Sequence, residues 1–248
     1  MGSIKNLLIV GRTNCGKSAL GNVLCNETCF EENESTFRNS KDFQEDKFRW
    51  NETEYRVVDM RIRSNDKNYL INRLCQVIYS MPEGISQVLF VIDERFTKEE
   101  IKTFKVFEST IFKTGIDKYT TIVRTKFENF KSKEECDNDK EDLCKAHKKI
   151  SKLCKNIVYV DNPPTKICVN DEDDNDTIKF NKKRREKSRT ILLSHLEKVC
   201  SNEYFKLNMW DKLNNSETPE EVERYIESED KKLAKLFKSK KNLHCSPS

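Results

Sequence analysis

The stretch Gly11-Arg12-Thr13-Asn14-Cys15-Gly16-Lys17-Ser18 decides the fold class of this chain. It matches the phosphate-loop pattern G-x-x-x-x-G-K-[ST], in which a glycine-rich turn joins a strand to a helix. The surroundings fit that context, because an apolar run over Asn6–Val10 precedes the loop and a helical stretch over Lys17–Cys25 follows it. The motif therefore predicts a site for nucleotide phosphates between a strand and a helix.

The residue types in this loop suit contact with phosphate and with a metal ion. Backbone N–H groups of such a loop converge on the β-phosphate, helped by the positive end of the following helix. We expect Lys17 to act catalytically by bridging the β- and γ-oxygens, and the Ser18 hydroxyl to ligate Mg²⁺. Asn14 stands where related loops carry glycine, and asparagine tolerates a positive φ. Cys15 has two interpretations, a redox-sensitive thiol near the phosphates or a small apolar filler. The predicted phosphate contacts are Gly11, Arg12, Thr13, Asn14, Cys15, Gly16, Lys17, Ser18 and Ala19.

Strand and helix patterns alternate along the rest of the chain, which is typical of an α/β fold. Continuous apolar runs suit strands covered on both faces of a parallel sheet, whereas the polar, alternating run Phe43–Trp50 suits an edge strand paired with its neighbour through Asn51–Glu54. We therefore predict an α/β fold with a mostly parallel six-stranded sheet and helices on both faces. The apolar runs are Asn6–Val10, Tyr55–Met60, Gln87–Asp93, Thr120–Arg124 and Asn156–Val160, and the helical stretches are Lys17–Cys25, Lys67–Tyr79, Thr97–Phe112, Lys133–Lys155 and Thr177–Cys200.

The chain divides into a predicted nucleotide-binding domain over residues 1–202 and a charged helical extension over 203–248. The extension carries one apolar stripe, formed by Val222, Ile226, Leu233, Leu236 and Phe237. Such a helix either packs back on the domain or binds a partner or a membrane surface. Before the last helical stretch of the nucleotide-binding domain, the acidic run Asp171–Asp176 lacks the EF-hand glycine, and we interpret it as a solvated loop.

Composition excludes several classes of protein and suggests a compartment. The 248 residues carry 46 lysines and arginines against 42 acidic residues, a net charge of +4 that argues against a dedicated nucleic-acid binder. The ten cysteines are spread along the chain without zinc-site spacing, so we expect free thiols in a reducing cytosol. No segment approaches the roughly 18 apolar residues of a membrane span. A cytoplasmic protein, in solution or peripheral to a membrane, is the expectation.

The base that such a nucleotide carries must be argued from residues further along the chain. Guanine recognition needs a carboxylate that accepts from two N–H groups and a lysine stem over the ring, which a strand followed by [NT]-K-x-D supplies. Here Thr120–Arg124 is followed by Thr125-Lys126-Phe127-Glu128, with glutamate in place of aspartate. Asp161-Asn162 follows the next strand, where a loop closes over the base. The predicted base contacts are Thr125, Lys126, Glu128 and Asn162.

Three stretches together resemble one known family. They are Gly11–Asn22 (GRTNCGKSALGN), Met81–Glu100 (MPEGISQVLFVIDERFTKEE) and Thr125–Glu128. These stretches resemble the immunity-associated GTPases (GIMAP/IAN family, avirulence-induced-gene type), which are relatives of septins. The resemblance covers about residues 5–200 and implies a P-loop GTPase fold. It also implies that the domain over residues 1–202 is a G domain that self-associates on GTP, often near membranes.

The chain departs from that family's pattern at the third motif, D-x-x-G. The strand ends Val57-Val58-Asp59 and continues Met60-Arg61-Ile62, so Asp59 is present to hold Mg²⁺ through water but no glycine follows to contact the γ-phosphate. No glutamine is placed to orient the attacking water. Slow GTP hydrolysis, or none, is therefore predicted.

Two further roles rest on weaker patterns. The residue that senses the γ-phosphate and completes the metal set of Ser18 and Asp59 is Ser40, with Thr36 as the other candidate. Arg95 is either a catalytic arginine finger acting across a dimer or a surface ion-pair residue.

The leading hypothesis is a GTP- and GDP-binding switch or scaffold that uses Mg²⁺. It would form a homodimer or larger oligomer through its nucleotide face, sometimes at a membrane, and would bind no nucleic acid. One alternative is a pseudo-GTPase that assembles without turnover. The other is a P-loop nucleoside or nucleotide kinase, which needs an arginine-rich lid; Arg184-Arg185 is the only adjacent arginine pair.

Overall fold

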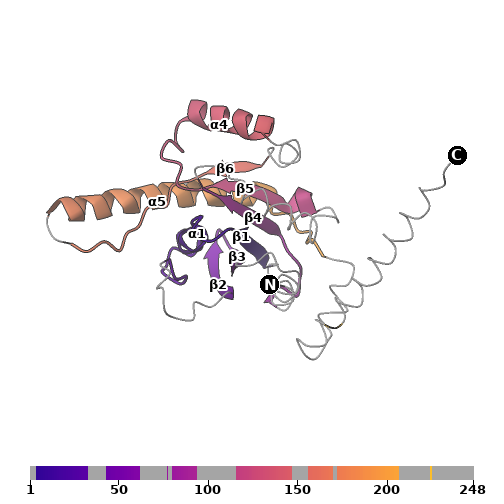
Figure 1. The fold of residues 1–248 in the computed structure, drawn as a ribbon. Coiled ribbons are helices and arrows are strands. Elements are labelled where there is room, and N and C mark those ends of the chain that lie inside the picture. Colours follow the sequence, from indigo (N-terminus) through magenta and orange to yellow (C-terminus); the bar gives the residue numbers. More distant parts are fainter. Residues whose placement is uncertain are drawn as a thin grey trace.

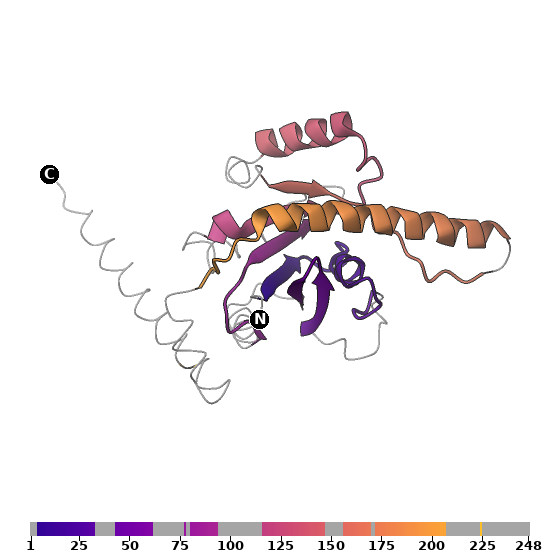
Figure 2. The ribbon, with the colours of Figure 1, turned by 180° about the vertical axis from the view of Figure 1, so that it is seen from behind.

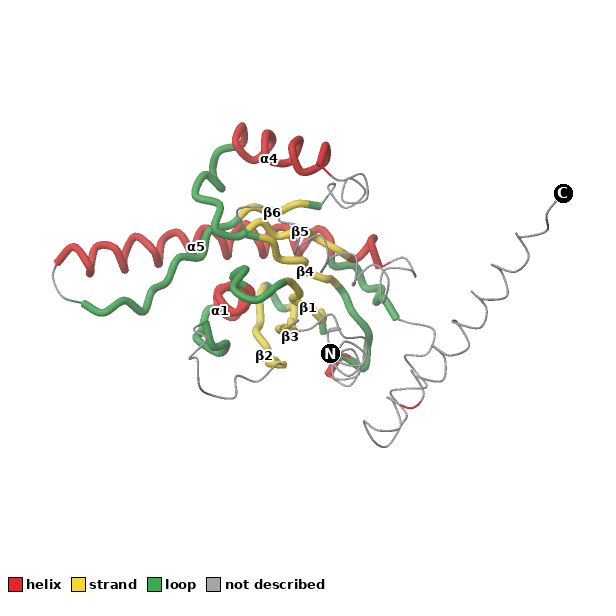
Figure 3. The backbone as a smooth tube through the Cα atoms, in the orientation of Figure 1, coloured by secondary structure: helices red, strands yellow, loops and turns green. Residues whose placement is uncertain are grey.

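A six-stranded sheet forms the centre of the molecule, with β1 in its middle. The computed structural model describes residues 4–32, 43–61, 77, 80–93, 116–146, 156–169, 172–206 and 224. Within them the strands lie in the order β2-β3-β1-β4-β5-β6, and all neighbours are parallel except the antiparallel pair β2 and β3 (Figure 3). The predicted fold class is confirmed. The strands are β1 (Lys5–Gly11), β2 (Phe43–Trp50), β3 (Thr53–Arg61), β4 (Gln87–Ile92), β5 (Thr120–Arg124) and β6 (Ile157–Tyr159).

Both faces of the sheet are buried, as the continuous apolar runs predict. Side chains alternate between faces, so Leu7 and Ile9 join the core under α1 (Lys17–Cys25) and α5 (Glu172–Val199). Leu8 and Val10, on the opposite face, are fully buried too. Figure 2 shows α5 crossing the sheet on the first of these faces. The helices add Leu20, Leu24, Leu192, Leu193 and Leu196 to that core.

The opposite face carries α4 (Lys133–Ala146), which lies beside β5 and β6 (Figure 1). Arg124 of β5 projects to this face, since its neighbour Val123 belongs to the α1 and α5 core. Its guanidinium forms a two-pronged ion pair with Asp139 of α4 and is 3% exposed. A short 3₁₀ turn, Ile116–Tyr119, leads into β5. The predicted helices over 67–79 and 97–112 lie outside the described residues, apart from Val77.

One local expectation was wrong: residues 172–176 are helical and form the first turns of α5. The acidic residues Glu172, Asp173 and Asp174 stand at the positive end of the helix dipole, where negative charge stabilises the helix. The same charges that suggested a solvated loop therefore favour an earlier helix start. As a result the first turns of α5 project beyond the sheet (Figure 1).

At the amino-terminal edge of the sheet, the chain after α5 packs back on the domain. Phe205 pairs with Ile85 in an antiparallel bridge and is buried, and the Tyr204 hydroxyl donates to the carbonyl of Ile4. Contact with the domain thus continues to residue 206, past the predicted boundary at 202. The boundary stays a prediction, and of the extension beyond 206 only Arg224 is described. No helix in the described part of the chain is long and apolar enough to span a membrane.

Candidate nucleotide site

The phosphate loop turns through two residues with left-handed backbone between β1 and α1. Gly16 has φ 89° and Asn14 has φ 65°, conformations that glycine and asparagine adopt most readily. This confirms the expectation that Asn14 tolerates a positive φ. The helix begins directly after the turn, with the Leu20 N–H donating to the Gly16 carbonyl at 2.9 Å. The positive end of α1 therefore lies at the loop.

The Lys17 side chain lies inside this loop, and its ammonium keeps N–H donors that can bind a ligand. Lys17 is 4% exposed, and its ammonium donates a hydrogen bond to the Arg12 carbonyl at 2.5 Å. Within the described part of the chain, no carboxylate forms an ion pair with it. A buried ammonium beside a helix N-terminus is an electrostatic environment that favours an anion.

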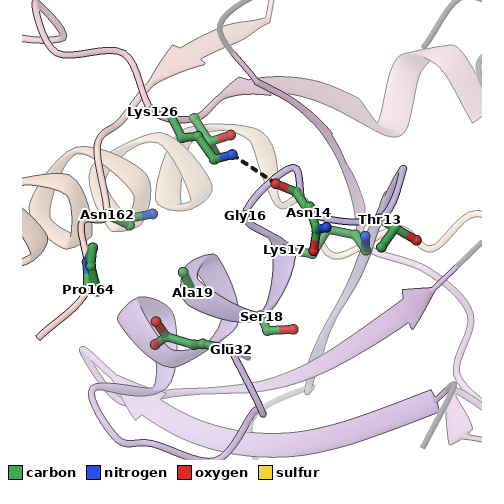
Figure 4. A pocket seen from close by; sticks show the side chains of 11 residues that line it. Thr13, Asn14, Gly16, Lys17, Ser18, Ala19, Glu32, Lys126, Asn162 and Pro164 are labelled. Atoms are coloured by element: carbon green, nitrogen blue, oxygen red, sulfur yellow. Dashed lines mark hydrogen bonds between the residues drawn. The ribbon is translucent and has the colours of Figure 1, made fainter. Parts of the chain in front are cut away.

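A cavity of about 220 Å³ opens next to the loop, at the carboxyl ends of the parallel strands. In parallel α/β sheets this edge is where ligands bind. Figure 4 shows the loop residues on one side of the cavity, with Lys126, Asn162 and Pro164 contributed from the loops after β5 and β6. With Glu32, from the connection between α1 and β2, four separate segments of sequence meet at one site. The lining residues are Thr13, Asn14, Gly16, Lys17, Ser18, Ala19, Glu32, Thr125, Lys126, Asn162 and Pro164.

Thr125 and Lys126 are fastened to the phosphate loop itself. The Thr125 hydroxyl donates to the carbonyl of Cys15 at 2.6 Å, and the Lys126 ammonium donates to the carbonyl of Asn14 at 2.9 Å. Lys126 adopts φ 53°, a left-handed backbone that turns the chain sharply after β5. These bonds hold Thr125 and Lys126 against the phosphate loop, and both residues line the cavity.

Asn162 presents an unsatisfied amide to the cavity. Both its Oδ1 and its Nδ2 are buried, and neither has a hydrogen-bond partner among the described residues. An asparagine side chain offers two donors and one acceptor, and a buried polar group without partners carries a free-energy penalty. A ligand with complementary polar edges would remove that penalty.

Ser18 and Asp59 form the candidate magnesium site. The Ser18 hydroxyl donates to Asp59 Oδ2 at 2.9 Å, and Asp59 is 1% exposed at the carboxyl end of β3. Hydroxyl and carboxylate oxygens are the donors that Mg²⁺ prefers, and Mg²⁺ takes its remaining ligands from water and phosphates. The described residues contain no cluster of three or more acidic, histidine or cysteine ligands.

The strand that carries Asp59 does not end there. Met60 pairs with Val10, and Arg61 pairs with Gly11 in the parallel ladder between β1 and β3. The glycine of a D-x-x-G motif would stand one position further on, at residue 62, which lies outside the described residues. Here the two residues after the aspartate are part of the sheet.

The sequence comparison agrees with this geometry. A family model described as the AIG1 family matches residues 5–221. The chain belongs to the AIG1 family. This confirms the resemblance to the immunity-associated GTPases. No curated protein sequence matches the chain.

Solved structures similar to this AIG1-family chain are P-loop GTPases. A dimerization-deficient mutant of Toc33 from Arabidopsis thaliana matches with a TM-score of 0.53 at 16% identity, over 80% of this chain and 85% of that one. Era, in complex with MgGDPNP and nucleotides 1506–1542 of 16S ribosomal RNA, matches with a TM-score of 0.52 at 14% identity, over 84% of this chain and 60% of that one. At these identities the likeness shows the fold. Family and fold together support a GTP-binding G domain.

Several predicted site residues of the AIG1-family chain do not line the cavity. Glu128 is exposed, and its backbone carbonyl accepts from Arg184 at 2.7 Å. Arg12 pairs with both carboxylate oxygens of Asp93 instead.

Cys15 is fully buried in the hydrophobic core, which favours the filler interpretation. A Cβ on Gly11 would lie 2.5 Å from the Val91 carbonyl oxygen, so glycine is needed there for close packing. Ser40, Thr36 and Arg95 lie outside the described residues.

The adjacent arginines that the kinase alternative would require for a lid are engaged elsewhere in this AIG1-family chain. Arg184 forms a 2.6 Å ion pair with Asp161, and Arg185 pairs with Glu32 through both of its terminal nitrogens. Both arginines lie on α5, within a regular helix. The described residues therefore place this pair in structural contacts rather than over the phosphates.

Two cavity residues, Glu32 and Pro164, were missed by the sequence analysis. The Pro163-Pro164 pair that follows Asn162 is a signal for an extended loop, and it could have suggested a wall beside the base. Glu32 has no such signal. Its position depends on Arg185, which lies 153 residues further along the chain.

Proposed function

We propose that this protein binds guanine nucleotides with Mg²⁺ and acts as a self-associating switch or scaffold. The observation that supports this most strongly is the convergence of the phosphate loop with Thr125, Lys126 and Asn162 around one cavity. A phosphate loop alone serves many nucleotides. The additional lysine stem and the unsatisfied amide of Asn162 favour a planar base with polar edges. Within the AIG1 family and the GTPase fold, guanine is that base.

Magnesium would be held at Ser18 and Asp59. The 2.9 Å hydrogen bond between them brings both oxygens to one point beside the phosphate loop, which supports this assignment. A divalent cation there supplies charge neutralisation for the β- and γ-phosphates. Lys17 would contact the same phosphates from the inside of the loop. The protein's contribution to the reaction would be to position the nucleotide. Ser40 remains a proposed further ligand.

Turnover is proposed to be slow. The paired backbone of Met60 and Arg61 keeps β3 in the sheet beyond Asp59, and the sequence has Ile62 where the D-x-x-G motif has its glycine. The sequence also has no glutamine in that region to orient water. A pseudo-GTPase without turnover remains the alternative, and the rate of hydrolysis distinguishes the two.

Self-association through the nucleotide face is proposed from the family resemblance. The Toc33 variant is described as dimerization-deficient, so a protein with this fold dimerises in its wild-type form. Arg95 would act across such a dimer as an arginine finger. A cytoplasmic location, with attachment at a membrane surface, belongs to the same proposal.

The test is a comparison of equilibrium affinities for GTP, GDP and ATP, each with and without Mg²⁺. We expect selective binding of the guanine nucleotides, strengthened by Mg²⁺ for GTP. Lys17→Ala should abolish binding, and Lys133→Ala, which removes an exposed lysine on α4, serves as the matched control. Equal binding of ATP would contradict guanine selectivity and favour the kinase alternative.

A further inference from the structure

One arginine on α5 ties together two walls of the nucleotide cavity. Arg185 donates from Nη1 and Nη2 to the two carboxylate oxygens of Glu32, at 2.8 and 2.7 Å. Its Nε donates to the carbonyl of Pro163 at 2.6 Å. Glu32 belongs to the connection between α1 and β2, whereas Pro163 belongs to the connection between β6 and α5. A single guanidinium therefore joins segments that are far apart in the sequence.

Both joined segments face the place where the nucleotide would lie. Glu32 and Pro164 line the cavity on the side away from the bond between Lys126 and Asn14 (Figure 4). The same two residues also line a neighbouring cavity of about 290 Å³. They therefore form the wall between the two spaces. Separating them would open the nucleotide cavity on this side.

The Glu32 end of the wall is anchored to α1. Asn22 is 4% exposed, and its Nδ2 donates to the Phe30 carbonyl and to Glu32 Oε1, each at 2.8 Å. Its Oδ1 accepts from the Phe30 N–H at 2.7 Å. Phe30 in turn packs on Gly21, where a Cβ would approach its ring to 2.8 Å. These contacts with α1 fix the position of the Glu32 carboxylate that Arg185 binds.

The charges suit a strong contact. The side chains of Arg185 and Glu32 are 12% and 27% exposed, so the pair is partly shielded from solvent. Bidentate pairs of arginine with a carboxylate are among the stronger hydrogen-bonded contacts in proteins. Burial alone would raise the pKa of Glu32, but the hydrogen bonds from Arg185 and Asn22 outweigh it and hold that pKa below its usual value. The carboxylate stays ionised at neutral pH.

We propose that Glu32 and Arg185 form a latch that holds the cavity closed around the bound nucleotide and so sets its dissociation rate. The inference rests on the proposed nucleotide-binding function. It assigns to these two residues a positioning role, because they act by fixing the cavity walls rather than by contacting the phosphates. Breaking the latch should speed the release of nucleotide and leave its entry unchanged or faster.

The experiment measures dissociation and association rates of a fluorescent GDP analogue with Mg²⁺. Glu32→Gln and Arg185→Gln are each expected to raise the dissociation rate about tenfold, equivalent to about 1.4 kcal/mol. The double variant Glu32→Gln/Arg185→Gln should be no faster than the single ones, because residues in one contact act non-additively. Glu186→Gln and Lys183→Gln change the same charges at exposed positions of α5 and serve as controls.

The outcomes separate the latch from a general structural role and from the function itself. A variant that is merely misfolded would lose association as well as retention, and its unfolding midpoint without nucleotide would fall. Dissociation rates that stay within twofold of wild type, or effects that multiply in the double variant, would overturn the latch. A wild-type protein that retains no guanine nucleotide would instead overturn the proposed function.

Discussion

At the scale of single residues, Thr125 links the phosphate loop to the ends of two strands. Its hydroxyl reaches the carbonyl of Cys15 at 2.6 Å and lies 3.2 Å from the carbonyl of Ile92, joining the phosphate loop to the ends of β4 and β5. The residue is 2% exposed. Because water cannot replace the bond there, the hydroxyl is required for the packing of the loop as well as for any contact with the base.

We expect Thr125→Val to destabilise the protein by about 1–3 kcal/mol, since valine keeps the shape but leaves a buried carbonyl without its donor. Denaturant unfolding measures the change. The control is Thr177→Val, at an exposed position of α5, which should be nearly neutral. If Thr125→Val were as stable as wild type, the hydrogen bond to Cys15 would make no net contribution to the free energy of unfolding.

Glu83 is a second residue whose environment leads to a measurable expectation. Burial raises its pKa, but hydrogen bonds from the Asn6 amide and the backbone, together with the Arg56 guanidinium, lower that pKa below its ordinary 4.5. A carboxyl group with a depressed folded-state pKa stabilises the fold above its unfolded-state pKa, and the contribution is lost as pH falls through the folded-state value.

The free energy of unfolding should therefore fall as the pH is lowered below about 4.5, and Glu83→Gln should flatten part of that slope. Urea unfolding at a series of pH values between 3 and 6 measures the slope. Glu203→Gln, at an exposed position, is the control. An identical slope in Glu83→Gln and wild type would show that Arg56 and Asn6 do not favour the charged form.

At the scale of elements, β3 decides the expected chemistry. A strand that ended at Asp59 would free the next residues to follow the γ-phosphate, but the ladder to β1 continues through Arg61. Leaving the sheet would break backbone hydrogen bonds in the middle of the molecule, and unpaired backbone groups are costly when buried. Metal binding by Asp59 is compatible with this arrangement, and under the proposed function we expect hydrolysis to be slow.

Single-turnover GTP hydrolysis by the isolated protein is expected to be no faster than the order of 10⁻⁴ s⁻¹ seen for Ras without its activator. The measurement is the release of labelled phosphate from a preformed complex at a protein concentration low enough to keep it monomeric. A rate near 10⁻² s⁻¹, as in G proteins with a built-in arginine, would contradict the prediction.

At the scale of the whole molecule, the two edges of the sheet perform different tasks. The carboxyl edge carries the cavity, and the amino edge holds the chain that leaves α5. Lys5 donates to the carbonyl of Ser201 at 2.7 Å, and Ile85 pairs with Phe205. Gly84 makes this crossing possible, since its φ is 105° and an added Cβ would lie 2.8 Å from the Phe205 carbonyl oxygen. The family-like stretch from Met81 thus anchors the C-terminal segment.

Gly84→Ala should destabilise the protein by at least about 1 kcal/mol, because an L side chain disfavours this backbone conformation and meets backbone atoms. Thermal unfolding measures the loss, and amide exchange at Phe205 should become faster. Guanine-nucleotide affinity is expected to change little, since the cavity is at the other edge. Glu203→Ala is the control, and unchanged exchange at Phe205 in Gly84→Ala would refute the anchoring role.

Local sequence patterns were enough to predict the fold class and part of the site. The phosphate-loop motif, the apolar runs and the polar edge strand predicted the class, the mostly parallel character of the sheet and the loop residues of the site, because backbone preferences and burial act over a few residues. The start of α5 was missed, since acidic residues serve equally in a loop and in the first turn of a helix.

The tertiary structure alone decided which side chains close the site. It brought Glu32 to the cavity through Arg185, kept Glu128 out of it, and extended β3 past Asp59. Each outcome depends on a partner distant in the sequence: a guanidinium on α5, the packing of the loops after β5 and β6, and a ladder with β1. Such contacts follow from how helices and strands pack together, and no short stretch of sequence encodes them.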